Sequence, residues 1–446
     1  MAKKLKQYCG RLLLEYFRFC AKIQLKKNPG AVIIGVTGSA GKTSTRAAIA
    51  QVLRTHGKIK ESVHSNSETG IPLNILGLRP HSYSLFDWIR LIIGAPVMLA
   101  CNWEHYTYYI VEMGINSPDT PKNMSYLLKI IQPHIGVILG VGLSHTEAFD
   151  QLVKDHDPIR RSAKLRVAIA KEKMLLAKSL SPRGVAIINI DQKELVKERR
   201  DIMARQITIG KSEKANLQIL QTDVGRGGFN LKMSYQGQIY QLRLPDLFPE
   251  VFAYTFAAAI AVGAALGIAP TASIPALSDY RAPAGRFRIF AGQKGSTIID
   301  SSYNASPDTM LQSLKHLKQL GGRGKKIAVV GDMRELGESE KSAHKNLADW
   351  LSTYTDEAIL FGGLTKKYVL PVLISRKFPV HHFDTMISLN KYLRSILKPK
   401  SFVLVKGSQN TILLERAVAA ILENKDDTKL LCRRGSYWDK VRAKTS

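Results

Sequence analysis

The sequence predicts an α/β fold: a central domain with a mostly parallel sheet, followed by a C-terminal, Rossmann-like α/β domain. Short apolar runs rich in β-branched residues alternate with helical patterns, as in parallel sheets whose strands are joined by helices. A glycine-rich turn separates the first such run from a helix, and 446 residues are enough for two or three cores. The predicted strands are residues 32–36, 108–113, 135–139, 185–190, 298–300, 327–330, 358–361 and 402–405.

Helical and irregular segments complete the predicted order. Residues 45–53 and the alanine-rich residues 256–266 have the pattern of packed helices, and residues 216–244 alternate in short segments, which predicts a small antiparallel insertion. A domain junction is predicted within residues 270–283. We therefore divide the chain into a basic amphipathic helix (1–30), a central domain (31–280), a C-terminal domain (281–425) and a basic tail (426–446).

The turn after the first strand has the composition of a phosphate-binding loop. Backbone N–H groups and the dipole of the following helix favour an anion there. In such loops a lysine, here Lys42, reaches the β- and γ-phosphates, and a threonine hydroxyl, here Thr43, binds Mg²⁺. The strict motif has a further glycine where this chain has Val36, but the intact Gly-Lys-Thr still predicts ATP and Mg²⁺ as cofactors. The loop residues are Thr37, Gly38, Ser39, Ala40, Gly41, Lys42, Thr43 and Ser44.

The net charge of +29 implies an anionic partner. Nucleic acid, anionic lipid and an acidic substrate all fit this charge, but no RNA- or DNA-binding signature accompanies it. Four cysteines without metal-ligand spacing fit a reducing compartment. We therefore expect a cytoplasmic monomer without a specific nucleic-acid partner, and peripheral contact with an anionic membrane stays open.

Two segments bear on membrane contact. The first thirty residues hold eight lysines and arginines and one acid, Glu15, with charged and apolar residues on separate helical stripes. Such a helix either lies on an anionic membrane surface or packs on the nucleotide-binding core. The apolar residues 88–101 are interrupted by Gly94 and Pro96, which argues against a spanning helix and favours a buried connection over a shallow membrane-contact hairpin.

Three polar residues outside the loop are further candidates. Glu112 ends a predicted strand, where a carboxylate beside a phosphate loop is placed to hold Mg²⁺. His145 follows the next strand, and Lys173 lies on a predicted helix. Each taken alone also has an ordinary structural interpretation, as a strand-end acid, a structural histidine and a solvated lysine.

The order of motifs resembles the Mur ligase family, ATP-dependent amide-forming enzymes of peptidoglycan precursor synthesis. The resemblance covers roughly residues 31–422, and the family's phosphate loop also lacks the glycine replaced here by Val36. Within the family, the segments around Asp300 and Asp332 favour the branch that adds D-alanyl-D-alanine. The segments that resemble family motifs are residues 66–72, 112–114, 145–149, 189–191, 283–286, 300–307, 331–337 and 406–408, with Glu415.

The resemblance implies roles for individual residues. Glu112 and His145 become Mg²⁺ ligands beside Thr43, and Lys173 matches a lysine that several members carbamylate to help hold a second metal ion. Arg286 faces the nucleotide phosphates and acts in catalysis with Lys42 and Lys173. The other implied site residues are Asp300, Tyr303 and Asn304 on the nucleotide side of the cleft, and Asn66, Asp332, Lys406, Gly407 and Ser408 on the substrate side.

The chain also departs from the family pattern. Val251, Phe252 and Thr255 stand where the family has polar adenine contacts, Ser301 replaces a second aspartate, and Gln409 replaces an arginine that bears on the amino substrate. About thirty residues precede the phosphate loop, where the family places a UDP-sugar-binding domain. Recognition of the sugar nucleotide is therefore expected to come from elsewhere, or the acceptor to differ, for instance by being lipid-linked.

These features predict an ATP-dependent ligase that joins a muramoyl-peptide carboxylate to an amino (dipeptide) substrate through an acyl phosphate. Phosphoryl transfer gives the carboxylate a good leaving group, and cations offset the repulsion between carboxylate and triphosphate. Two alternatives stay open. One is another amide ligase on this scaffold, similar to folylpolyglutamate or cyanophycin synthetase; the other is a basic membrane- or nucleic-acid-binding ATPase that forms no amide.

Overall fold

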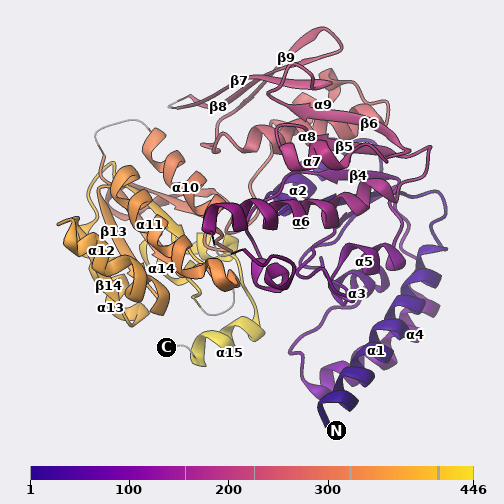
Figure 1. Cartoon of the computed structure of the whole chain (residues 1–446), viewed down its shortest axis with the longest axis horizontal. Coiled ribbons are helices and arrows are strands. Elements are labelled where there is room, and N and C mark those ends of the chain that lie inside the picture. Colours follow the sequence, from indigo (N-terminus) through magenta and orange to yellow (C-terminus); the bar gives the residue numbers. More distant parts are fainter. Residues whose placement is uncertain (1, 156, 226, 321–323, 409–411, 445–446) are drawn as a thin grey trace.

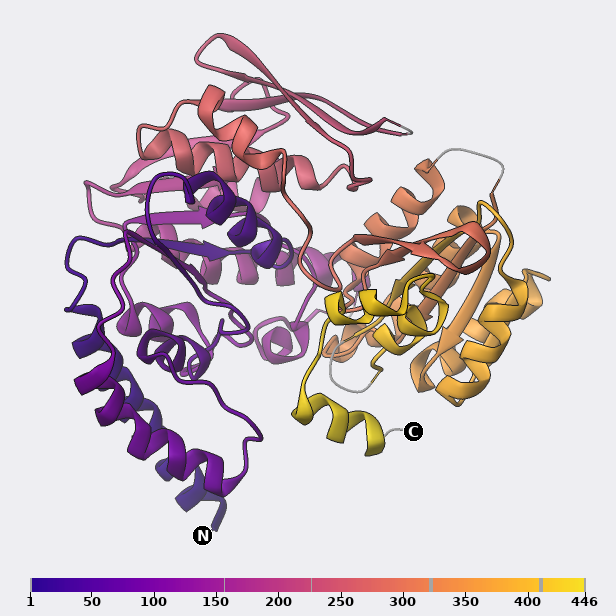
Figure 2. The same ribbon diagram turned by 180° about the vertical axis from the view of Figure 1, so that it is seen from behind.

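Two sheets organise the chain, and helices cover both faces of each sheet (Figure 1). The computed structural model describes residues 2–155, 157–225, 227–320, 324–408 and 412–444. The predicted α/β architecture with a second, C-terminal sheet is confirmed. Figure 2 shows the two sheets side by side, joined by the segment after residue 277.

The first sheet is parallel over most of its width. Its strands lie in the order β2 (Ile59–Glu61), β3 (Tyr108–Glu112), β1 (Val32–Thr37), β4 (Ile135–Ile138), β5 (Val185–Asn189), β6 (Arg205–Gly210), β7 (Leu217–Gly225), β8 (Gly228–Tyr235) and β9 (Gln238–Leu244). Strands β2 to β7 pair in parallel, whereas β7, β8 and β9 pair antiparallel. The antiparallel segment predicted at residues 216–244 therefore extends this sheet.

Side chains alternate between the two faces of the first sheet, so its hydrophobic core consists of two clusters, one on each face. On β3, Ile110 packs in one cluster and Tyr109 and Val111 pack in the other, because successive strand residues point to opposite faces. The first cluster lies under α2 (Lys42–Leu53), α8 (Phe252–Ala265) and α9 (Pro270–Leu277). The second lies under α5 (Met124–Ile130), α6 (Pro158–Lys178) and α7 (Lys193–Glu198).

The second sheet has the order β10 (Arg288–Gly292), β11 (Ser296–Asp300), β15 (Phe402–Lys406), β12 (Lys326–Gly331), β13 (Glu357–Phe361) and β14 (Val380–Phe383). Only the β10–β11 pair is antiparallel. One face packs on α10 (Pro307–Gln319), α11 (Glu340–Tyr354) and α12 (Leu370–Ser375), and the other on α13 (Met386–Ile396) and α14 (Glu415–Ile421). The tail ends in α15 (Ser436–Lys444).

The N-terminal segment forms α1 (Ala2–Leu25), which lies alongside α4 (Leu85–Cys101) and packs on α3 (Gly70–Leu76). The prediction of a buried connection at residues 88–101 is wrong, because this segment forms most of α4, is largely exposed, and buries only Leu91 and Ala95. Pro96 lies inside the helix. Pro96 has no N–H to donate to the Ile92 carbonyl. The Tyr16 hydroxyl of α1 donates to that carbonyl instead, at 2.8 Å.

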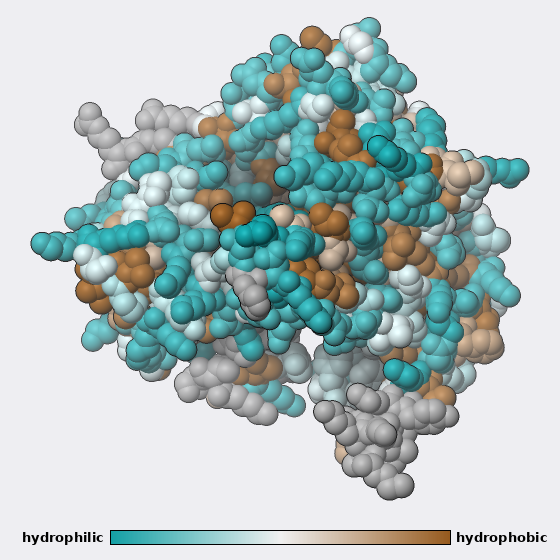
Figure 3. All heavy atoms as spheres, viewed as in Figure 1, coloured by the Kyte–Doolittle hydropathy of each residue, from teal (hydrophilic) through white to brown (hydrophobic). Residues whose placement is uncertain are grey.

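The surface is predominantly polar on the face drawn in Figure 3, where apolar residues form separate patches. Within the described residues, no helix combines the length and the hydropathy that crossing a bilayer requires.

Candidate active site

The phosphate loop joins β1 to α2, as the sequence predicts. Gly41 directly precedes α2 with φ of 83°, a left-handed conformation that costs glycine little. The Lys42 ammonium donates to the Gly38 carbonyl at 2.7 Å. Burial lowers the pKa of Lys42 to about 8, although Glu112 acts in the opposite direction. The loop thus combines a desolvated cation with a helix N-terminus, an arrangement that favours a bound polyphosphate.

Glu112 lies beside this loop because β3 and β1 are neighbours in the sheet. Its carboxylate accepts a hydrogen bond from the Thr43 hydroxyl at 3.0 Å, and the Arg46 Nε lies 3.1 Å from its other oxygen. Glu112 and Arg46 are both buried, so the guanidinium offsets the carboxylate charge.

The Thr43 and Glu112 oxygens are the donor type that Mg²⁺ prefers. The described residues contain no cluster of three or more His, Cys, Asp or Glu side chains able to hold a metal on its own. These two donors nevertheless fit Mg²⁺, since that ion commonly takes one or two protein ligands and completes its shell with phosphate oxygens and water.

The C-terminal domain supplies two more cations. The Arg286 guanidinium lies over the Tyr303 ring, 4.2 Å from its centroid. Gly285 has φ of 70°, and a Cβ at this position would lie 2.9 Å from the Tyr303 backbone nitrogen. The Lys406 ammonium, at the end of β15, donates to the Ser301 hydroxyl at 3.1 Å and to the Asn304 carbonyl at 2.9 Å. Burial, reinforced by Arg286, lowers the pKa of Lys406 to about 7.

Asp300 anchors the loop that carries Tyr303. It is fully buried at the end of β11, and its Oδ1 accepts from the Ser302 hydroxyl at 2.6 Å and from the Ser302 N–H at 3.1 Å. Burial raises the pKa of Asp300. Within the described residues its other oxygen has no hydrogen-bond partner, and Asp300 also acts electrostatically on Lys406.

Both domains line one cavity of about 360 Å³. It brings together the phosphate loop of the central domain and Arg286, Asn304 and Lys406 of the C-terminal domain. Val251, Phe252 and Thr255, which replace polar family residues, line it as well, so this part of the wall is largely apolar. The residues of the phosphate loop that line the cavity are Ser39, Ala40, Gly41 and Ser44.

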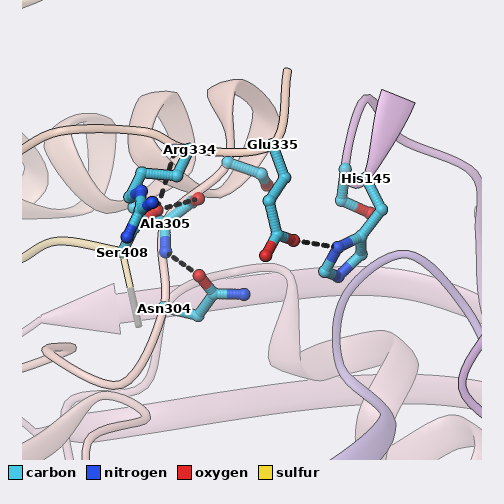
Figure 4. A pocket seen from close by; sticks show the side chains of 8 residues that line it. His145, Asn304, Ala305, Arg334, Glu335 and Ser408 are labelled. Atoms are coloured by element: carbon cyan, nitrogen blue, oxygen red, sulfur yellow. Dashed lines mark hydrogen bonds and ion pairs between the residues drawn. The ribbon is translucent and has the colours of Figure 1, made fainter. Parts of the chain in front are cut away.

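A smaller pocket at the domain boundary contains His145 (Figure 4). The His145 Nδ1 pairs with the Glu335 carboxylate of the opposite domain, and this contact lowers the pKa of Glu335. Asn304 and Ser408 line the same pocket. The structure therefore places His145 in a pocket with Asn304 and Ser408 and gives it an acidic partner from the C-terminal domain.

The remaining predicted residues lie in three settings. Lys173 is buried on α6, where burial and the charge of Lys42 hold its pKa well below the usual range.

The Asn66 carbonyl accepts from the Gly114 N–H at 2.8 Å, beside the end of β3. Asp332 accepts from the N–H groups of Leu364 and Thr365. In the segment of Gly407 and Ser408, the Ser408 N–H donates to the Asp332 carbonyl, and Gln409 lies outside the described residues.

Hydrogen bonds and ion pairs connect the domains around the cavity. The Asp308 carboxylate, in the first turn of α10, accepts from the Leu143 N–H at 2.8 Å and lies 2.6 Å from the Arg166 guanidinium of α6. The Thr146 hydroxyl donates to the Leu336 carbonyl at 3.0 Å. These contacts hold the two walls of the cleft face to face.

Two arginines at the site were missed by the sequence analysis. Arg46 lies one helical turn after Lys42, so the spacing along α2 was an available signal. Arg433 falls within the predicted basic tail, with no role expected for it. It is buried, donates to the Ser302 and Tyr303 carbonyls and pairs with Glu415 at 2.8 Å. No local pattern indicates this, because the tail must fold back first.

Comparison with known proteins gives matches over both domains. The Mur ligase middle domain matches residues 36–263, and the Mur ligase glutamate ligase domain matches residues 285–409. The chain is 28% identical over 398 residues to the UDP-N-acetylmuramoyl-tripeptide–D-alanyl-D-alanine ligase of Buchnera aphidicola subsp. Baizongia pistaciae, covering 86% of this chain and 74% of the relative. The Bacillus subtilis ligase of the same name is 25% identical, over 89% and 77%.

Solved structures share the fold. MurF ligase from Thermotoga maritima, in complex with ADP, has a TM-score of 0.73 at 22% identity and covers 97% of this chain and 84% of its own. Escherichia coli FolC, in complex with ADP and DHPP, has a TM-score of 0.60 at 18% identity, over 90% and 91%.

The two sheets, the phosphate loop and the cations gathered from both domains define an ATP-dependent, ADP-forming carboxylate–amine ligase. More specifically, the chain belongs to the Mur ligase family, since the middle-domain match alone covers just over half of its length.

Proposed function

We propose that this protein joins D-alanyl-D-alanine to the carboxylate of a muramoyl tripeptide at the expense of ATP. The observation that carries this proposal is that the phosphate loop, Arg286 and Lys406 line the same cavity. The D-alanyl-D-alanine ligases named above support the choice of substrates.

The reaction has two balanced steps. The tripeptide carboxylate attacks the γ-phosphorus of ATP, which forms an acyl phosphate and releases ADP. The amine of the dipeptide then attacks the acyl carbon, inorganic phosphate leaves and the nitrogen loses a proton. Lys42 on one wall and Arg286 on the other supply positive charge where the two anions meet.

Mg²⁺ would be held by Thr43 and Glu112, and it supplies charge neutralisation of the phosphates. Lys173 is the second part of this proposal. Burial and the charge of Lys42 hold the pKa of Lys173 well below its usual range, which favours the neutral amine that adds to CO₂. The resulting carbamate would present carboxylate-like oxygens near Lys42.

The protein acts as a cytoplasmic monomer that touches a membrane only at its surface. The basic α1 and the net charge of +29 support attraction to anionic lipid.

The test is product formation by the purified full-length chain. With ATP, Mg²⁺, UDP-muramoyl tripeptide and D-alanyl-D-alanine, we expect ADP release that depends on both substrates and a pentapeptide product by mass spectrometry. Dihydropteroate or folate with glutamate is the matched comparison for the rival ligases. ADP release without any new amide, or an amide formed only with folate and glutamate, contradicts the proposal.

A further inference from the structure

The α1–α4 helix pair has one face built into the central domain. Phe17 and Cys20 of α1 pack with Leu91 and Ala95 of α4 in a buried cluster that also includes residues of α3. The Tyr16 hydroxyl bonds the Ile92 carbonyl, and the Gln24 amide bonds the Asn102 carbonyl at 2.8 Å, so the helices run in the same direction. Figures 1 and 2 show the pair at one end of the molecule, on the side away from the second sheet.

The opposite face of the pair is apolar and exposed. On α4, Phe86 is 83% exposed, Leu85 73% and Ile93 63%, and Trp103 just after the helix is 62% exposed. We call these four residues, with Ile89 and Val97, the outer apolar face. Leu12, Phe19 and Ile23 on α1 are exposed as well. Isolated exposed apolar side chains are ordinary, but an aligned row along a whole helix indicates an interaction surface.

Exposed cations lie on and just after α1, which packs beside α4, and the acids of the two helices are already paired. Arg11 and Lys22 on α1 and Lys26 just after it are exposed. Glu15, the single acid of α1, pairs with Arg18. Asp87, the single acid of α4, is buried and accepts backbone N–H groups of residues 81–83 and the Arg90 guanidinium.

The end of α4 adds an interfacial aromatic. The Lys27 ammonium donates to the Asn102 carbonyl at 3.1 Å and lies 4.2 Å from the centre of the Trp103 ring. Glu104 next to it pairs with Lys60. A tryptophan beside a cation is typical of residues that sit at the boundary between headgroups and acyl chains.

We propose that the outer apolar face is a docking surface for an anionic lipid bilayer, with α4 lying in the plane of the headgroups. Its apolar side chains would enter the acyl boundary while the bordering lysines and arginines meet the anionic headgroups. Self-association through this face would bring the same cations of two copies together, which charge repulsion opposes. This face would make the peripheral membrane contact proposed above. Docking of the face on lipid does not depend on the ligase reaction.

The test is flotation of the full-length protein with phosphatidylcholine vesicles and with vesicles containing 30% phosphatidylglycerol. We expect binding to the anionic vesicles only, and at least a tenfold lower partition coefficient for the Phe86→Gln/Ile93→Gln variant. The control is Ile387→Gln, an equally exposed apolar residue on α13 of the other domain, which should bind like the wild type. Ligase activity on water-soluble substrates should be unchanged in all three proteins, so failure of docking and failure of the proposed reaction are separable.

Charge is tested with Lys22→Glu/Lys26→Glu against Lys341→Glu/Lys345→Glu on α11. The first variant should lose binding at least fivefold more than the second. Quenching of tryptophan fluorescence by brominated acyl chains should decrease in Trp103→Phe. Equal losses in both charge variants, or unchanged binding of Phe86→Gln/Ile93→Gln, would mean mere adsorption of a cationic protein and would overturn the proposal. So would a concentration-dependent dimer that Phe86→Gln dissociates, because the face would then bind a second copy.

Discussion

The two walls of the cleft position their cations in different ways. On the central domain, Lys42 and Arg46 lie on the first turns of α2. Glu112 on the neighbouring strand lies 3.1 Å from the Arg46 Nε and also acts electrostatically on Lys42, so a carboxylate offsets both charges. On the C-terminal domain, Lys406 donates to a hydroxyl and to a carbonyl, and Arg286 stacks on Tyr303. The first wall is a local motif, whereas the second is assembled from distant segments and depends on the tail.

The largest effect is expected at the local wall. Lys42→Met should lower ligase kcat/KM at least about 100-fold, because a preorganised charge at the transferring phosphoryl group is lost. Initial rates of ADP release at substrate concentrations well below KM measure it. Lys345→Met on α11, an exposed lysine, is the control and should keep full activity. Wild-type rates in Lys42→Met would show that the loop does not carry the chemistry.

The C-terminal wall of the cleft should be most sensitive to changes in the tail, which supplies Arg433. Arg433→Met leaves Glu415 buried without its closest partner, and breaking such a pair costs about 3–5 kcal/mol of unfolding free energy. It also removes the donors to the Ser302 and Tyr303 carbonyls, so we expect kcat to fall at least about tenfold as Arg286 loses its ring support. ADP affinity, set by the phosphate loop, should stay within about threefold.

Urea unfolding and steady-state rates separate these two effects. Arg433→Met/Glu415→Gln should recover part of the stability, since no carboxylate is then left unpaired, but not kcat. Arg434→Met, the exposed neighbour, should match the wild type in both. If Arg433→Met kept kcat, the assembled wall would not depend on the tail.

The same contrast explains what the sequence could predict. The loop, Glu112 and the strand ends follow from short patterns, because β1 and β3 are parallel neighbours whose carboxyl ends meet at one edge. The burial of Arg433 depends on a tail that returns across the second sheet, which no spacing encodes. Residues 88–101 were misread because Pro96 normally breaks a helix, and the compensating donor, Tyr16, is far away in sequence.

The next largest effect is expected from the protonation of the two lysines, one on each wall of the cleft. Burial lowers the pKa of Lys42 to about 8 and that of Lys406 to about 7, from 10.5. Between those values and 10.5 the unfolded chain binds more protons, so stability should rise with pH across this window. A bound triphosphate favours the charged amines and raises both pKa values, so nucleotide binding should take up protons and weaken as pH rises above 8.

Calorimetry at pH 8 in buffers of different ionisation enthalpy measures this uptake. Lys406→Met should reduce it more than Lys42→Met, because the lower pKa leaves Lys406 more often neutral before binding. Lys345→Met should leave it unchanged. Proton release on binding, in place of uptake, would contradict the assigned directions.

The smallest effect is expected where the walls touch. Asp308→Asn weakens the contact with Arg166, and both side chains are about one-third exposed, so solvent screening limits the coupling to about 0.2–1 kcal/mol. We expect KM for ATP to rise about two- to fivefold with kcat nearly unchanged, because only the alignment of the two domains is relaxed. A double-mutant cycle with Arg166→Met measures the coupling. Glu198→Gln, which removes a comparable pair with Lys178 inside the central domain, should leave KM unchanged. If KM for ATP rose equally in Asp308→Asn and Glu198→Gln, the rise would reflect a general loss of stability. The contact between Asp308 and Arg166 would then have no separate role in aligning the two domains.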